Sequence, residues 1–107
     1  MLIEEFDSNS DSLVSLAKKV RDSKRPDYTL GKANVLSNFD STGSDVDLPP
    51  EKVLWILLKK HLDAILATVR DPSLGQSEPI DLRFADAINY LLLLYSIIKR
   101  RDGDKTV

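Results

Sequence analysis

Four polar side chains stand close together in the segment SEPIDLRFADAINY, residues 77–90. Glu78 and Asp81 are three residues apart, and so are Asp86 and Asn89. In a helix such pairs are surface neighbours, and all four side chains then fall within about 140° of the helical circumference. Carboxylates gathered in this way can hold Mg²⁺ or Mn²⁺, which prefer oxygen ligands and share them with substrate phosphates. The pattern therefore predicts a metal site on Glu78, Asp81 and Asp86.

A purely structural explanation of the same residues is also open. The helix dipole favours acidic side chains near a helix start, which accounts for Glu78 and Asp81. Asp86 could be paired with Arg83 or with a lysine. Asp86 and Asn89 lie deeper among apolar neighbours, where leaving them unpaired would cost several kcal/mol. We therefore expect both of these side chains to have partners.

The only histidine of the chain is the natural candidate for such a partner. His61 lies on a face of leucine and isoleucine residues at helical spacing, and Lys60 stands at the edge of that face. A single inward histidine is more often a hydrogen-bonded core residue than a catalyst. If its helix packs antiparallel to the helix that carries Asp86 and Asn89, His61 can approach either of them. Lys60 can then balance the carboxylates or meet a phosphate.

The first of the helices that must position these groups is expected near the N-terminus. Residues 8–11 include good helix-capping types, and apolar residues follow at helical spacing. This helix should stop before Pro26, because a proline pushes the preceding residue out of the α region. Residues 26–48 then form an irregular connection in which Gly43 marks a tight turn. At most one short apolar turn is expected within the connection, formed by Val35, Leu36 and Phe39.

Two further helices complete the expected fold. The second opens at residues 49–51, with proline in its first turn, and runs to about Arg70. The third begins near Ser77 or Glu78 and ends in residues 99–101, where cations suit the negative helix end. The sequence thus predicts an all-α protein with three main helices and a long structured loop between the first and the second.

The third helix is apolar on nearly every side. A helix of this kind must be covered all round, and two partner helices in so small a chain hardly suffice. We therefore expect a helical bundle completed by oligomerisation, as a homo-oligomer that is most simply a two-fold dimer or else a higher assembly.

Bulk composition narrows the class of protein. The 107 residues fit one domain, 1–107, with residues 1–9 and 102–107 as flexible termini. A net charge of −2 gives no field for DNA, RNA or anionic membrane, and the basic run KKVRDSKR, residues 18–25, is interpreted as a solvated helix end. There is no cysteine and no apolar run near the ~20 residues that span a bilayer. We expect a soluble protein of the cytoplasm.

The segments KRPDYTLGKANVLSNF, LPPEKVLWILLKKHLDAI and SEPIDLRFADAINYLLLL together resemble a family of small phage and prophage proteins of unknown function, sometimes labelled as associated with nucleotide modification. The resemblance covers about residues 20–100. It implies a phage context and an all-α fold, and with them the cytoplasm of a host cell. The matching positions are Lys24, Asp27, Tyr28, Asn38, Phe39, Lys60, His61, Leu62, Glu78, Asp86, Asn89 and Tyr90.

A wider similarity is to MazG-type all-α nucleotide pyrophosphohydrolases, helical oligomers in which acidic helices hold Mg²⁺. Glu78 and Asp81 fit their E-x-x-D pattern, whereas the preceding helix carries Lys60, His61 and Asp63 where a paired acidic motif is expected. By this resemblance the protein is a Mg²⁺-dependent (d)NTP pyrophosphohydrolase-like enzyme, in which the metal activates the attacking water.

Two other functions stay open at this point. In the first, the protein catalyses nothing and sequesters a nucleotide, a nucleotide-derived signal or a host protein to counter a host response. The ligand would then contact Lys60, His61, Asn89 and the loop residues Tyr28, Asn38 and Phe39. In the second, the protein is a purely structural oligomer in which the polar residues 78–89 are solvated or paired.

Overall fold

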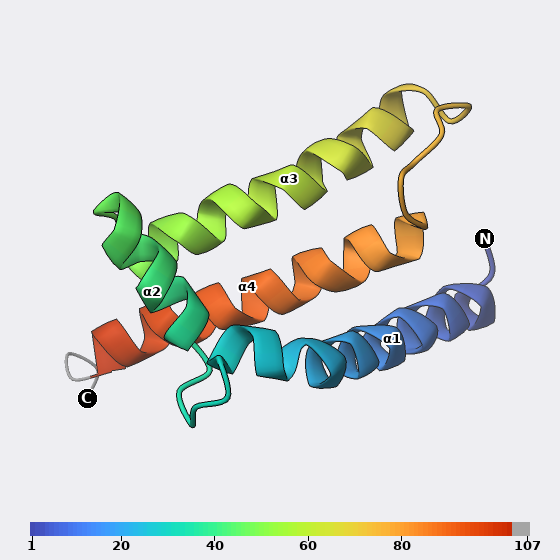
Figure 1. Ribbon diagram of the computed structural model, residues 1–107. Coiled ribbons are helices and arrows are strands. Elements are labelled where there is room, and N and C mark those ends of the chain that lie inside the picture. Colours follow the sequence, from blue (N-terminus) through green and yellow to red (C-terminus); the bar gives the residue numbers. More distant parts are fainter. Residues whose placement is uncertain (104–107) are drawn as a thin grey trace.

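Four helices build the chain in the computed structural model, which describes residues 1–103 and contains no strand in that range. They are α1 (Ile3–Thr29), α2 (Ser37–Val46), α3 (Pro50–Arg70) and α4 (Ile80–Gly103). Figure 1 shows α4 running between α3 and α1, with the short α2 lying across one end. The all-α class is confirmed, but the chain has a fourth helix where a loop was predicted.

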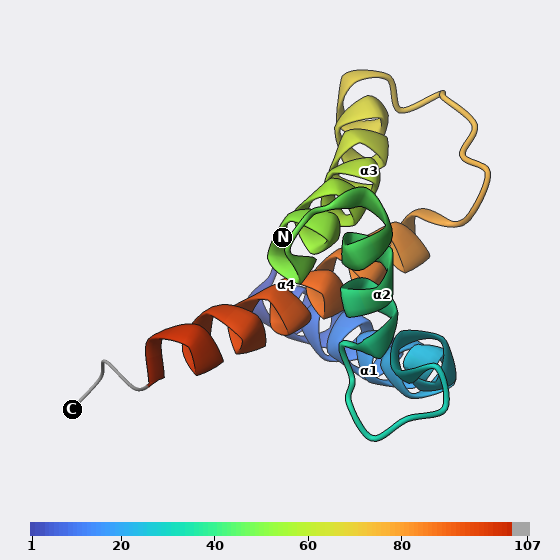
Figure 2. The ribbon, with the colours of Figure 1, turned by 60° about the vertical axis from the view of Figure 1, so that its left-hand side comes forward.

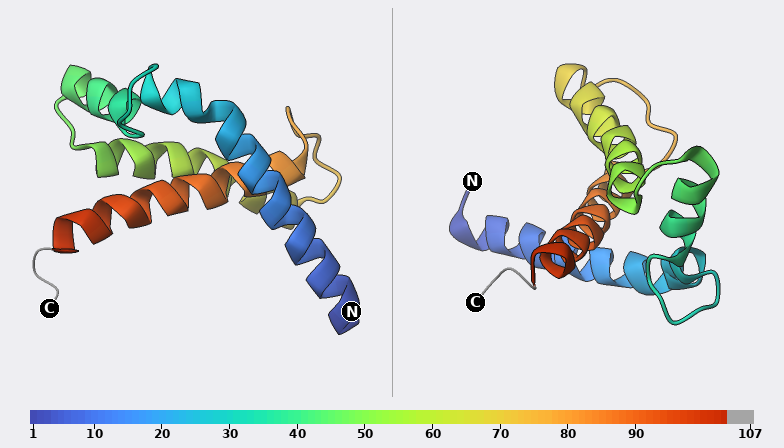
Figure 3. Two further views of the ribbon diagram at one scale, coloured as in Figure 1. Left: turned by 90° about the horizontal axis from the view of Figure 1, so that it is seen from below. Right: turned by 90° about the vertical axis from the view of Figure 1, so that its left-hand side faces the viewer.

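The first helix differs most from the prediction. It begins at Ile3 instead of near residues 8–11, and it continues through Pro26 to Thr29. A proline inside a helix lacks the backbone N–H and crowds the preceding turn, which bends the helix but need not end it. In Figure 3 the cyan part of α1 indeed runs in a different direction from the blue part. The helix ends at Leu30, whose φ of 52° lies in the left-handed region.

The predicted loop contains the helix α2. Gly43, expected in a tight turn, lies buried inside α2. Its carbonyl accepts a 2.8 Å hydrogen bond from the Leu48 N–H, and a Cβ added at Gly43 would collide with the Leu48 carbonyl. Glycine is required here because the backbone after α2 folds back onto the helix, which only a residue without a side chain allows.

The two long central helices follow the prediction closely. Helix α3 spans Pro50–Arg70, and α4 begins at Ile80, slightly later than the predicted start near Ser77. The short connection 71–79 makes them antiparallel neighbours, as Figure 1 shows. His61 therefore lies beside the N-terminal half of α4, which carries the polar cluster.

The core is shared by all four helices. Tyr28 and Phe39 pack with their ring centroids 5.5 Å apart, and Phe39 meets Tyr90 at 6.4 Å. Helix α2 is thus part of the core and not a loop over a site. The buried members of this cluster are Tyr28, Leu36, Phe39, Val53, Leu54 and Ile97.

Several apolar side chains of α3 and α4 stay exposed. They include Trp55 and Ile56 on α3 and Leu91 and Tyr95 on α4. In Figure 2 the C-terminal turns of α4 extend past the other helices. No helix within residues 1–103 is both long and apolar enough to span a lipid bilayer. Of the predicted flexible termini, residues 3–9 and 102–103 are helical, and 104–107 lie outside the described residues.

Candidate functional site

Asp86 lies at the junction of three helices and is 3% exposed. Its Oδ1 atom accepts a 2.8 Å hydrogen bond from the Lys24 Nζ atom of α1. The Nε2 atom of His61, on α3, lies 3.9 Å from the other carboxylate oxygen. Asp86 thus has the partner that its burial requires, and the lysine that supplies the charge is Lys24 instead of Lys60.

His61 is buried and uncharged at neutral pH. Its ring stacks on Tyr90 with centroids 5.4 Å apart, and its Nδ1 atom lies 3.5 Å from Nη1 of Arg83. Because arginine only donates, Nδ1 is the acceptor and Nε2 carries the proton. Burial lowers the pKa of His61; Asp86 and Glu78 raise it, and Arg83 and Lys24 lower it further. A neutral, enclosed imidazole cannot neutralise a phosphate.

Arg83 forms an ion pair with Glu78, the other carboxylate of the cluster. Its Nη1 atom lies 3.1 Å from Glu78 Oε1, and its Nη2 atom donates a 3.0 Å hydrogen bond to Ser77 Oγ. The Arg83 side chain is about 10% exposed, so this pair is shielded from solvent on the arginine side. Two ion pairs thus flank His61, each with one buried member, Asp86 or Arg83, and one partly exposed member, Lys24 or Glu78.

The structure brings together two of the three predicted metal ligands. Ligand atoms of His61, Glu78 and Asp86 lie within 4.8 Å of one another, but Asp81 is exposed and outside this group. Each of the two carboxylates already has a cationic side chain on it, and a Mg²⁺ ion there would be repelled by both. The third donor is an imidazole nitrogen, whereas Mg²⁺ prefers an octahedron of oxygens. As arranged, these residues do not offer Mg²⁺ the oxygen donors that it prefers.

A second polar feature lies beside this cluster. The Nδ2 atom of Asn89 donates a 2.9 Å hydrogen bond to the Ala17 carbonyl of α1. The Oδ1 atom of Asn89 and the hydroxyl of Tyr28 are buried and have no hydrogen-bond partner within residues 1–103. Burial raises the pKa of Tyr28, and the nearby Tyr90, Asp86 and Asp27 raise it further, so the hydroxyl stays a neutral donor. Each unpaired buried group costs about 1–3 kcal/mol.

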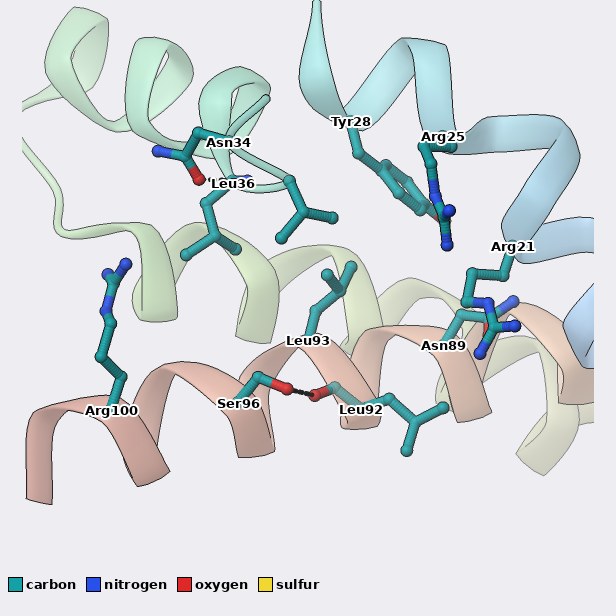
Figure 4. Close-up of a pocket in the computed structure, with 11 residues that line it drawn as sticks. Arg21, Arg25, Tyr28, Asn34, Leu36, Asn89, Leu92, Leu93, Ser96 and Arg100 are labelled. Atoms are coloured by element: carbon teal, nitrogen blue, oxygen red, sulfur yellow. Dashed lines mark hydrogen bonds between the residues drawn. The ribbon is translucent and has the colours of Figure 1, made fainter. Parts of the chain in front are cut away.

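Both atoms belong to side chains that line a pocket of about 440 Å³ between α1, α4 and the start of α2. Figure 4 shows Arg21 and Arg25 descending from α1 near Asn89, and Arg100 rising from α4 at the opposite end. Leucines at positions 36, 92 and 93 lie between these ends. No described residue that lines the pocket is acidic.

The arginines that line the pocket remain available to bind an anion, because their ion pairs are with an exposed carboxylate or are absent within the described residues. Arg21 and Arg25 lie 3.4 and 3.6 Å from Asp22, whose side chain is 64% exposed. An exposed pair of this kind contributes little stability and is readily exchanged for another anion. Arg100 forms no ion pair with any residue from 1 to 103. The pocket therefore combines three available guanidinium groups with two unsatisfied buried polar atoms.

The remaining predicted contact residues lie elsewhere. Lys60 is exposed on α3 and has no ion pair or hydrogen bond with the described residues, so it reaches neither the cluster nor the pocket. Phe39 is 2% exposed and its ring is enclosed by the core, which leaves no face for a ligand. Asn38 is half-buried on α2 and is not among the residues that line the pocket. Tyr28 and Asn89 alone, of the predicted contact residues, line it.

Three of the pocket's charges and the partner of Asp86 were not predicted. Arg21, Lys24, Arg25 and Tyr28 follow one another at the 0, 3, 4, 7 spacing of a single helical face. This signal is present in the basic run 18–25, which was interpreted as a solvated helix end, and only Tyr28 requires the helix to continue through Pro26.

No family model matches the sequence, and no curated protein and no solved structure matches it either. The resemblance to phage proteins and to nucleotide pyrophosphohydrolases therefore stays a prediction.

Proposed function

We propose that the protein is a non-catalytic binder of a phosphate-bearing small molecule of the nucleotide class. One observation carries the proposal. A pocket lined by Arg21, Arg25 and Arg100 is also lined by Tyr28 and Asn89, whose hydroxyl and amide oxygen are buried and have no hydrogen-bond partner within residues 1–103. This corresponds to the alternative in which the protein sequesters a nucleotide or a nucleotide-derived signal, as the phage resemblance also suggests.

The arginines support a phosphate ligand. A guanidinium group presents paired N–H donors that match phosphate oxygens, and such charge-assisted bonds are roughly twice as strong as neutral ones. Arg21 and Arg25 are four residues apart on α1, so both can reach one phosphate. A phosphate can replace the exposed Asp22 carboxylate beside these two arginines. It meets no electrostatic repulsion from the pocket wall, because no described lining residue is acidic.

The floor of the pocket supports a ring beside the phosphate. Leu36, Leu92 and Leu93 offer apolar surface to a ring face, and the two buried polar atoms offer one donor and one acceptor. The edge of a nucleobase carries both functions and can pair with each of them. A ligand that forms hydrogen bonds with both atoms removes the free-energy cost of leaving them buried without partners.

The same geometry argues against hydrolysis. The two carboxylates of the buried cluster, Asp86 and Glu78, are held by Lys24 and Arg83, and the His61 imidazole is enclosed. No acid or imidazole lines the pocket itself among the described residues, so no general base faces a bound phosphate. Stoichiometric binding needs none of these groups.

The proposal is tested by calorimetric titration with nucleoside monophosphates, nucleoside triphosphates, adenosine and inorganic phosphate, all in EDTA. We expect metal-independent binding of phosphorylated compounds and about tenfold weaker binding of adenosine. Arg25→Gln should weaken binding by a similar factor, whereas Lys60→Gln, an exposed cation outside the pocket, should not. Absence of binding for every nucleotide, or Mg²⁺-dependent pyrophosphate release from a triphosphate, would contradict the proposal.

We also propose that two copies associate through a groove between α3 and α4. The groove is formed by Trp55, Ile56, Leu94 and Ile98, and its edges carry Glu51, Lys52 and Arg101. A two-fold contact places the same patch on both sides, so a rim with both signs of charge is complementary to itself. This surface supports the dimer that we expected from the apolar sequence of α4.

A further inference from the structure

We infer that the ligand of the arginine pocket carries phosphate on both sides of its nucleoside, one group at each end of the pocket. The inference rests on the proposed function and narrows the ligand class. Nucleosides phosphorylated at both the 5′ and the 3′ positions have this shape. Nucleotides with all their phosphates in one chain do not.

The pocket's charges are divided between two ends. Arg21 and Arg25 come from α1 and lie near Asn89, whereas Arg100 comes from the last turns of α4 (Figure 4). Asn89 and Arg100 are eleven residues apart on one helix, which corresponds to about 16 Å at 1.5 Å per residue. Arg100 therefore starts from the opposite end of the pocket from Arg21 and Arg25, where it can bind a second phosphate.

The surface between the two ends is not charged. Leu92 and Leu93 lie there, together with Ser96, whose hydroxyl donates a 2.8 Å hydrogen bond to the Leu92 carbonyl. The Ser96 donor is thereby already used within α4. The middle of the pocket suits a sugar and a base, and the donor and acceptor of Tyr28 and Asn89 are placed at the end that Arg21 and Arg25 also occupy (Figure 4).

Helix electrostatics alone does not account for Arg100. A cation near the C-terminal end of a helix is favoured by the dipole, but the neighbouring Arg101 satisfies the same preference. Arg101 lines the groove on the other side of α4, beside Trp55 and Ile98, and its Nε atom is 3.1 Å from Asp102. Arg100 faces the pocket and has no ion pair within the described chain. The two adjacent arginines are therefore a matched pair for experiment.

The test compares two isomeric ligands that carry the same number of phosphates. Adenosine 3′,5′-bisphosphate and adenosine 5′-diphosphate, and the guanosine equivalents, are titrated in EDTA against the full chain. We expect the 3′,5′-bisphosphate to bind about tenfold more tightly, because only it can engage both ends. Arg100→Gln should abolish this preference, whereas Arg101→Gln, outside the pocket, should leave both the preference and the affinity for the 5′-diphosphate unchanged.

The outcomes separate the two proposals. Equal affinity for the two isomers, or a preference that survives in Arg100→Gln, overturns the two-ended ligand but leaves nucleotide binding standing. Loss of the preference in Arg101→Gln as well as in Arg100→Gln also overturns it, since general charge would then explain the effect. Failure of both isomers to bind at all overturns the proposed function and this inference with it.

Discussion

At the scale of single residues, Asp86 shows what a sequence pattern can predict about a buried charge and what it cannot. Its position among apolar neighbours predicted that it needs a partner, and it has one in Lys24 at 2.8 Å. The choice of partner was not predictable from local spacing, because Lys24 and Asp86 are 62 residues apart. Proximity along α3 favoured Lys60, which the structure leaves exposed.

Removing the Lys24 charge should destabilise the fold. In Lys24→Met the Asp86 carboxylate, 3% exposed, stays buried without its cation. Breaking a fully buried pair costs about 3–5 kcal/mol, and because the Lys24 side chain is 38% exposed we expect about 2 kcal/mol less free energy of unfolding. Urea denaturation measures this quantity.

Two further variants give this measurement its control. The double variant Lys24→Met with Asp86→Asn should recover most of the loss, because no buried charge then remains unpaired. Lys60→Met should change the urea midpoint little. If Lys24→Met unfolds at the same urea concentration as the unchanged protein, the pair does not stabilise α1 against α4.

Acidification should weaken the fold through His61. Burial lowers its pKa below the ordinary 6.5, so the unfolded chain takes up the proton more readily than the folded one. The stability from the neutral imidazole is complete above about pH 6.5 and is lost as the pH falls toward the folded-state pKa. Asp86 and Glu78 oppose this shift, and Arg83 and Lys24 add to it.

The measurement is urea denaturation at several pH values between about 8 and about 5.5, where histidine is the ordinary titrating side chain. The free energy of unfolding of the unchanged protein should fall across this range, and His61→Gln should show a flatter profile. Parallel profiles for the two proteins would show that His61 does not carry the effect.

At the scale of helices, the sequence prediction succeeded where apolar periodicity is strong and failed where it is weak. Helix α3 has proline in its first turn, a clear apolar face and a cation in its last turn, and its bounds were predicted. Helix α2 has the sequence SNFDSTGSDV, with few apolar residues and a glycine, so only its packing against the core makes it helical. Helix α1 was predicted to end before Pro26, which separated Tyr28 from the basic face of the same helix that forms one end of the pocket.

A methyl group at Gly43 tests how α2 is held. In Gly43→Ala the new Cβ meets the Leu48 carbonyl, so the chain after α2 must move away. We expect the free energy of unfolding to fall by about 1–3 kcal/mol, the usual cost of overpacking. Gly75→Ala is the matched control, since an added Cβ there meets nothing within 4 Å. Equal urea midpoints for the two variants would mean that α2 does not require the close approach.

At the scale of the whole molecule, the apolar surface of α3 and α4 accounts for the expected association. Ile56 is 57% exposed and lies in the groove between the two helices. If two copies associate as proposed, Ile56→Asp should give a monomer in sedimentation experiments and a melting temperature that no longer depends on protein concentration. Val69→Asp serves as control, because Val69 is 71% exposed on the same helix but does not line the groove. A monomer at all concentrations in the unchanged protein would contradict the association.

The whole molecule also explains why the candidate site was only partly predictable. Tyr28 and Asn89 were expected to contact a ligand and do line the pocket, but the pocket forms only where α1 meets α4, which are distant in sequence. Which helical face meets which depends on the bend in α1 and on the packing of α2, and neither follows from local periodicity. The all-α class needed only the apolar pattern and was correct.

The central claim is that the pocket of Arg21, Arg25 and Arg100 binds a phosphorylated nucleoside, and residue-resolved NMR tests it most directly. On titration of ¹⁵N-labelled protein with adenosine 3′,5′-bisphosphate in EDTA, we expect the Asn89 side-chain amide and the Nε–H signals of these three arginines to shift together. The Nε–H signal of Arg101 should stay in place. Shifts confined to residues outside the pocket, or no shift at saturating nucleotide, would contradict the account.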